Sequence, residues 1–278
     1  MSGISSKEKY TESFMKFFTS KILTYAVAFF LCSHLFASEN GKKSLFFIFF
    51  TGEAIVDKIH KKAWERCFKD FREDFEVWYV KTDSSTETSP FLLQNLIDLK
   101  KPKDFKRQKG WGFIECLNLF QTRLGEFKHV IKADIRSFVV MSKLKKILES
   151  RSEKDLYLGN VSTHETINGK WSYVDSSLAI FSKENARFLS ESFIFIEALG
   201  ANKYQDENIL IGAILNKKGV SPFHVPSYPI RTFVRPFKLF NKIDHSTFVF
   251  HLNPFRPTRT FLEREIILLD EFFEIFCS

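Results

Sequence analysis

A carboxylate that directly follows an apolar segment is the first feature of this chain that could do chemistry. Residues 127–134 read FKHVIKAD, so Asp134 ends a run rich in apolar residues, and apolar residues then recur at helical spacing up to Leu148. Open α/β sheets bind their ligands outside the carboxyl ends of such strands. We therefore expect Asp134 at a sheet edge, facing a cleft. The alternative is that Asp134 only ends the strand.

The rest of the sequence alternates apolar strands with helical segments, which predicts a single α/β domain. The expected architecture is a central, mostly parallel sheet flanked by helices. Its central strands are predicted at 44–50, 75–80 and 127–133. The other expected elements are helices at 53–71, 105–124, 183–199, 206–217 and 260–276, strands at 156–159, 171–181 and 247–251, and a loop that contains His164.

Composition and charge narrow the class of partner. The chain has 278 residues, 44% of them apolar, which is enough for a sizeable core and excludes wholesale disorder. Its formal charge of +8 is scattered, and no nucleic-acid motif occurs, so we expect a diphosphate-bearing ligand or a membrane surface and no nucleic acid. The four cysteines show no metal-ligand spacing and define no disulfide framework, although a Cys67–Cys116 bridge stays open.

The N-terminal segment predicts entry into a membrane system. Residues 1–21 are polar and net positive, and residues 22–37 are almost uninterruptedly apolar, as in a secretory signal peptide or a short signal anchor. The alternative is a buried N-terminal helix. We divide the chain into residues 1–43, a signal anchor or signal peptide with a short spacer, and one domain at 44–278. An Asn160-Val161-Ser162 sequon matters only if the domain enters a eukaryotic lumen.

Several short motifs, in their order and spacing, resemble those of the β-1,3-glycosyltransferases, the family of galactosyl-, N-acetylglucosaminyl- and Fringe-type enzymes. The segment KADIRSFV aligns without a gap to the family's K-T-D-D-D-V-F-V. The other matching segments are KIHKKAW at 58–64, VKTD at 80–83, YVDSSLAIFS at 173–182 and QDENILIG at 205–212. The resemblance spans about 44–275 and implies a nucleotide-diphospho-sugar transferase fold of the GT-A type.

The resemblance also implies an activity and a place. It implies an inverting hexosyltransferase that moves a sugar from a UDP-sugar to a hydroxyl of a glycan or glycoprotein, in β-1,3 linkage. Asp83, Asp134 and Arg136 would bind the nucleotide sugar, and Asp134 and His251 would hold a divalent ion such as Mn²⁺. The protein would work in a Golgi-type lumen as a single-pass type II membrane protein, anchored through residues 22–37, or would be secreted after cleavage.

The sharpest departure from the family is Arg136, which occupies the third position of the acidic triplet, the place of the main metal ligand. A guanidinium cannot ligate a cation, but it can hydrogen-bond a diphosphate bidentately. Either the enzyme works without metal, with Arg136 supplying the positive charge, or donor binding is damaged. In addition, Ser176-Ser177-Leu178 replaces the family's glycine run. A non-catalytic, secreted or membrane-tethered binding protein that keeps the fold is therefore the alternative function.

An inverting transfer needs one carboxylate that deprotonates the acceptor hydroxyl. Asp206 and Glu207, at the start of a predicted helix, are the candidates. The register of the motif stays open: counted without a gap from Gly212, Asn208 takes the base position, and with one extra residue Glu207 takes it, with Asp206 before it. The alternative is that both only cap the helix and complement its dipole.

Overall fold

The computed structural model describes residues 43–50, 54–81, 95–99, 112–151, 154, 156–166, 169–192, 206–231, 249–253, 267, 269–271 and 274. All of them lie in one compact unit, residues 41–278. The predicted anchor at 22–37 and the candidate Asp83 lie outside the described residues. Within the described residues, no helix has the length and apolar character needed to cross a membrane.

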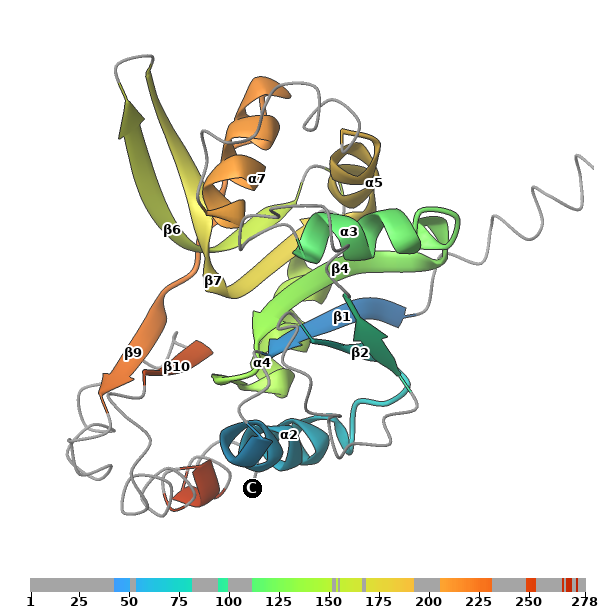
Figure 1. The fold of residues 1–278 in the computed structure, drawn as a ribbon, viewed down its shortest axis with the longest axis vertical. Helices are drawn as coiled ribbons and strands as arrows, with labels where there is room; N and C mark the ends of the chain where they lie inside the picture. Colours follow the sequence, from blue (N-terminus) through green and yellow to red (C-terminus); the bar gives the residue numbers. More distant parts are fainter. Residues whose placement is uncertain are drawn as a thin grey trace, which may run out of the picture. The chain divides into compact units, whose positions relative to one another are not determined.

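A seven-stranded sheet forms the centre of the unit, in the order β3-β2-β1-β4-β7-β6-β8 (Figure 1). The pairs β1–β2, β1–β4, β2–β3 and β6–β8 are parallel, whereas β7 runs antiparallel to both of its neighbours. This confirms the α/β class and the three predicted central strands. The strands are β1 (Lys43–Phe50), β2 (Phe75–Lys81), β3 (Leu96–Asp98), β4 (Phe127–Asp134), β6 (Tyr157–Thr166), β7 (Gly169–Ser182) and β8 (Phe223–His224).

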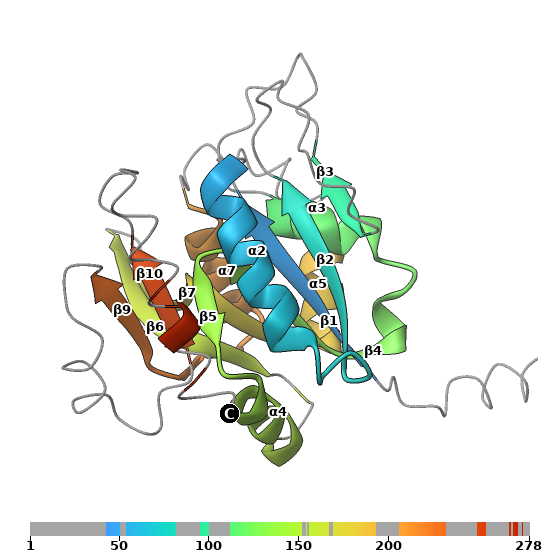
Figure 2. The same ribbon diagram turned by 90° about the horizontal axis from the view of Figure 1, so that it is seen from below.

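Helices cover both faces of this sheet because the side chains of a strand point alternately to its two sides. On β1, Phe46 and Ile48 join one buried cluster and Leu45 and Phe47 the other. The helices α2 and α4 contribute to the first cluster and α3, α5 and α7 to the second (Figures 1 and 2). They are α2 (Ala54–Phe68), α3 (Gly112–Leu119), α4 (Met141–Ser150), α5 (Lys183–Glu191) and α7 (Glu207–Lys217).

A second, three-stranded sheet packs on the α2 side. Its order is β5 (Ser137–Val139), β10 (Val249–Asn253) and β9 (Ser227–Arg231). Phe138 and Phe250 belong to the same buried cluster as α2. The helical spacing of apolar residues that follows Asp134 in the sequence belongs only in part to a helix, because residues 137–139 form β5, which pairs antiparallel with β10, and α4 begins at Met141.

The outer half of the β6–β7 hairpin differs from the predicted loop that contains His164. His164 does not lie in a loop: both strands continue outward, and His164 pairs with Trp171 across the hairpin, their rings 4.9 Å apart. Its polar composition resembles that of a loop, which explains the error. The predicted helix at 206–217 is confirmed, with Gly219 in the left-handed region (φ 84°) just after its end.

Cys67 and Cys116 do not form a disulfide, because they lie on opposite faces of the sheet. Cys67 packs in the cluster with α2 and Cys116 in the cluster with α3, so the sheet separates the two thiols, and neither is in a disulfide. Of the predicted C-terminal helix, the described residues 267, 269–271 and 274 are helical, and the rest lies outside the described part of the chain.

Candidate functional site

The chain order of the large sheet reverses between β1 and β4. From β1 the chain proceeds to β2 on one side, and β4 later pairs with the other side of β1, where Phe49 stands opposite Asp134. The crevice outside the carboxyl ends of parallel strands at such a switch point is where open α/β sheets bind ligands. Asp134 therefore stands at the end of β4 beside this switch point, and its role in ligand binding stays a prediction.

The turn at residues 134–137, which follows β4, is fixed from three sides. The backbone N–H of Ile135 donates to the carbonyl of Phe49 (2.8 Å), and the indole Nε1 of Trp64 on α2 donates to the carbonyl of Ile135 (2.9 Å). The hydroxyl of Ser137 donates to the carbonyl of Ser177 on β7 (2.6 Å). Functional groups that are held in this way by packed elements keep one orientation before a ligand arrives.

The carboxylate of Asp134 is half-buried and contacts the backbone of the 134–137 turn. Its Oδ1 accepts a hydrogen bond from the backbone N–H of Arg136 (2.8 Å). Among the described residues it makes no other hydrogen bond, so Oδ2 keeps its full capacity to accept. The turn thus presents an acidic group and, two residues on, the residue that carries a guanidinium.

The described residues do not by themselves fit a divalent ion. They contain no group of three His, Cys, Asp or Glu side chains that could hold one. Asp134 contributes a single carboxylate, and the guanidinium of Arg136, two residues on, cannot ligate a cation. The main chain of His251 lies in β10 and pairs with Ser137, the last residue of the 134–137 turn. The side chain of His251 lies outside the described part.

Asp206 and Glu207 both lie at the N-terminus of α7, but their carboxylates have different surroundings. Asp206 is exposed and is the N-cap residue: its Oδ1 accepts from the backbone N–H of Asn208 (2.7 Å) and from Nδ2 of the Asn208 side chain (3.0 Å). Within the described residues Oδ2 of Asp206 has no partner. One carboxylate oxygen of Asp206 therefore caps α7, and the other, Oδ2, can accept a hydrogen bond from a ligand.

The carboxylate of Glu207 is fully committed to the structure. The side chain is 7% exposed, Oε1 accepts from the backbone N–H groups of Phe113 (2.7 Å) and Ile114 (3.2 Å), and Oε2 pairs with Lys132 Nζ (2.8 Å). Glu207 thus caps α3 from a distance of 94 residues in sequence. Burial and, next, the charge of Glu207 raise the pKa of the nearby Cys116 thiol well above its ordinary value, so this cysteine is a neutral core residue.

Lys132 is the residue of this region that sequence reasoning misses. It is 6% exposed and donates to Glu207 Oε2 and to Asn208 Oδ1, both at 2.8 Å. Its ammonium group also lies 5.7 Å from the ring centres of Phe49 and Phe113. The signal was available: a lysine inside an apolar strand must find a charged partner elsewhere, because a buried unpaired charge is too costly.

On β7, the segment that replaces the family's glycine run forms a polar network. The carboxylate of Asp175 accepts from the backbone N–H of Ser177 (3.0 Å), from the Ser177 hydroxyl and from the side-chain amide of Asn160. Ser177 is buried and Ser176 is exposed. Asn160, the acceptor of the glycosylation sequon, therefore lies in strand β6 with its amide nitrogen engaged.

The comparisons with known proteins give structures but no sequence family. No protein-family model matches the chain, and no curated protein does. Similar folds occur in the galactosyltransferase LgtC, solved with donor and acceptor sugar analogues (16% identity, TM-score 0.48, covering 82% of this chain and 95% of that one). An active-site mutant of LgtC gives 16% identity, a TM-score of 0.46 and the same coverage.

A further similar structure is a glycosyltransferase involved in the glycosylation of the major capsid of PBCV-1. Its identity is 10% and its TM-score 0.46, over 81% of this chain and 98% of that chain. The three structures are those of two glycosyltransferases, since two of them are of LgtC. At these identities and TM-scores, none of them assigns an activity to this chain.

Proposed function

We propose that this chain is a nucleotide-sugar-dependent glycosyltransferase of the GT-A type. It moves a sugar from a UDP-sugar to a hydroxyl group of a glycan or glycoprotein. The observation that carries the proposal is the fixed 134–137 turn, since it places a carboxylate and an arginine at the switch point of the sheet. The same residues form the segment KADIRSFV, on which the resemblance to the β-1,3-glycosyltransferases rests, and this supports an inverting transfer in β-1,3 linkage.

In the proposed donor site, Asp134 accepts hydrogen bonds from the nucleotide sugar and Arg136 binds the diphosphate. A guanidinium can make two charge-assisted hydrogen bonds to phosphate, each contributing about 1.5–3 kcal/mol. Arg136 thereby takes over part of the electrostatic role that a metal has in the family. Asp83 and His251, whose side chains lie outside the described part, complete the donor site in this proposal.

The proposed reaction is a single displacement. The acceptor oxygen forms a bond to the anomeric carbon while the bond from that carbon to the diphosphate oxygen breaks, and UDP leaves with its charge balanced by Arg136. The proton of the acceptor hydroxyl passes to a carboxylate. We assign this role to Asp206, since both oxygens of Glu207 are already occupied.

Calorimetric titration with UDP tests the proposal. Wild-type protein is titrated with Mn²⁺ and with EDTA, beside Arg136→Ala and the control Arg187→Ala, which removes an exposed arginine of α5. We expect wild type and Arg187→Ala to bind UDP in EDTA and Arg136→Ala to lose binding. Loss of wild-type binding in EDTA would show that a metal is held by other residues and that Arg136 does not replace it.

The alternative is a binding protein that keeps the fold and has lost transfer. Arg136 in place of an acidic residue, and Ser176-Ser177 in place of glycines, favour it. If UDP binds, an assay of UDP-sugar hydrolysis that measures the UDP released distinguishes the enzyme from the binding protein. Absence of both UDP binding and hydrolysis would reject the enzyme.

We further propose that residues 22–37 direct the chain to a membrane, with the domain at 44–278 on the lumenal side. N-terminal sequencing of the mature protein separates the two forms, since a start at Ser38 means a cleaved signal peptide. Because the amide of Asn160 is engaged by Asp175 within a strand, we expect the sequon to stay unmodified even in the lumen. A mobility shift on enzymatic deglycosylation that Asn160→Gln abolishes would contradict this.

A further inference from the structure

Lys132 connects the strand that carries Asp134 with the start of α7. Residues two apart on a strand point to the same face, so Asp134 lies on the same face of β4 as Lys132, whose ammonium group contacts residues of α3 and α7. There the ammonium group of Lys132 donates to Glu207 and to Asn208. The strand end and the helix start are therefore joined by a buried charge, and not by apolar contact alone.

The hydrogen bonds continue from Lys132 to Asp206 in a fixed direction. An ammonium group only donates, so the atom of the Asn208 amide that faces Lys132 must be the oxygen Oδ1. The other amide atom, Nδ2, then has to face Asp206, where it donates to Oδ1 at 3.0 Å. Together with the bond from the Asn208 backbone N–H, this holds one oxygen of Asp206 and leaves Oδ2 to the solvent side.

We infer that Lys132 and Asn208 are positioning residues, which orient the carboxylate of Asp206 for proton abstraction. The inference rests on the proposed function. Glu207 has a separate role: it neutralises Lys132 and binds the start of α3 at the same point, so that the ammonium group keeps its place over the rings of Phe49 and Phe113. General-base catalysis depends on such placement within hydrogen-bond reach of the acceptor hydroxyl.

Replacement of Asn208 by aspartate tests the orientation through the pH dependence of turnover. Asn208→Asp keeps an oxygen toward Lys132, but it puts a second carboxylate next to Oδ1 of Asp206. A second negative charge at this distance raises the pKa of a carboxyl group, because it disfavours the ionised form. We expect the acidic limb of kcat/KM for UDP-sugar hydrolysis or transfer to move upward by about one pH unit, and Asn208→Ala to lower kcat roughly tenfold with the donor KM within about twofold.

The chain offers a matched control in Asn185 of α5. This asparagine is also buried, accepts from a lysine ammonium (Lys218 Nζ, 2.8 Å) and donates through Nδ2 to a backbone carbonyl, that of Leu156. Asn185→Asp therefore makes a comparable change beside Lys218, the C-cap residue of α7, at the opposite end of that helix from Asp206. It should leave the pH profile of turnover in place, and an equal shift in both variants would overturn the inference.

Lys132 is tested in a double variant, because its loss alone would leave the buried charge of Glu207 without its cation, which can prevent folding. The double variant Lys132→Met/Glu207→Gln removes both charges and keeps the acceptor for the α3 backbone. We expect this folded variant to lose kcat as Asn208→Ala does. Normal kcat in the folded double variant would refute a positioning role for Lys132.

A readout without turnover separates this inference from the proposed function. In ¹⁵N-labelled protein, the side-chain NH₂ signals of Asn208, assigned with Asn208→Ala, should shift in Asp206→Asn and lose exchange protection in Lys132→Met/Glu207→Gln. Unchanged signals would overturn the orientation. UDP binding with unaltered turnover of Asn208→Ala would overturn the catalytic part and leave the function intact, whereas absence of UDP binding in wild type would reject the function itself.

Discussion

The indole nitrogen of Trp64 donates a 2.9 Å hydrogen bond to the carbonyl oxygen of Ile135, 71 residues further along the chain. Trp64 is 1% exposed, and its ring stacks on Phe68 of the same helix. One side chain of α2 therefore satisfies the backbone of the 134–137 turn from inside the core. The position of the candidate donor site depends on how α2 packs.

Trp64→Phe should weaken both the fold and the site. The carbonyl of Ile135 would lose its buried donor, which costs about 1–3 kcal/mol of unfolding free energy. Urea denaturation measures the loss, and UDP titration should show weaker binding. In the control Trp78→Phe the lost partner is the half-buried Glu76 side chain, so UDP affinity should stay at the wild-type level.

Gly212→Ala should destabilise the protein by about 1–3 kcal/mol, because it overpacks the contact of α7 with β7. A Cβ at Gly212 would lie 2.4 Å from Cβ of Tyr173 and 2.9 Å from the carbonyl oxygen of Ser172. Thermal and urea unfolding check the size of the effect. At Gly125 an added Cβ has no neighbour within 4 Å, so Gly125→Ala is the matched control and should leave the unfolding midpoint close to that of wild type.

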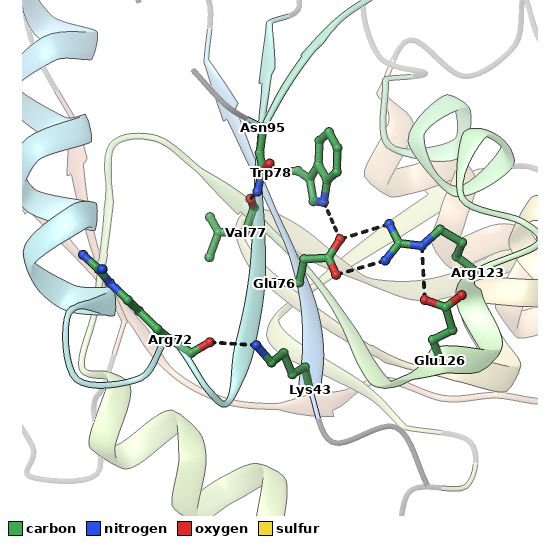
Figure 3. Close-up of polar contacts among 8 residues, drawn as sticks. All are labelled: Lys43, Arg72, Glu76, Val77, Trp78, Asn95, Arg123 and Glu126. Carbon is green, nitrogen blue, oxygen red and sulfur yellow. Dashed lines mark hydrogen bonds and ion pairs between the residues drawn. The ribbon is translucent and has the colours of Figure 1, made fainter. Parts of the chain in front are cut away.

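Acid should weaken the protein partly through Glu76. Arg123 binds both oxygens of Glu76 at 3.1 Å, and Trp78 donates to one of them (Figure 3). Burial acts to raise the pKa of Glu76, but the hydrogen bonds from Arg123 and Trp78, with the charges of Arg123 and Lys43, outweigh it and lower the pKa.

The sign of the pH effect follows from that lowered pKa. A carboxyl group whose pKa is lower in the folded state stabilises the protein above its unfolded pKa of about 4.3, and this stabilisation is lost as the pH falls through the folded value. Urea unfolding at pH 6 and pH 3 should therefore show a larger loss for wild type than for Glu76→Gln. Equal losses in the two proteins would contradict a stabilising role of the Arg123 contact.

Arg136→Asp should make nucleotide binding depend on metal. The substitution places a second carboxylate two residues after Asp134 in the fixed turn, and hard divalent cations prefer such oxygen ligands. UDP titration of Arg136→Asp should give binding with Mn²⁺ and none with EDTA. Binding that stays independent of metal would show that the triplet is misaligned with the family.

The strand framework could be predicted from local patterns. The apolar run in β1 and the carboxylate after β4 are visible in the sequence, as are the Asp206 cap and Gly219 at the two ends of α7. Each of these is decided within about ten residues of chain. The predicted position of Asp134 at the end of a central strand is therefore correct.

The remaining parts of the site depend on contacts between distant segments. Nothing near Glu207 in sequence tells that its carboxylate caps α3, because the donors lie 93 and 94 residues away. The choice between Asp206 and Glu207 stays open for the same reason until their partners are seen. Sequence patterns do not indicate the outer half of the β6–β7 hairpin, because its strands are polar there. In the structure this half contacts α7, where Trp171 donates to the carbonyl of Ile209.

The central place of β1 has a consequence for synthesis of the chain on the ribosome. β1 contains six consecutive apolar residues, at 45–50. One edge of this strand pairs with β4, which leaves the ribosome more than 80 residues later. At roughly 5–20 residues per second, β1 waits for about 4–16 s with that edge unpaired. Such a segment is prone to aggregate. Nascent chains of this protein should therefore need a chaperone that holds β1 until translation has passed Asp134.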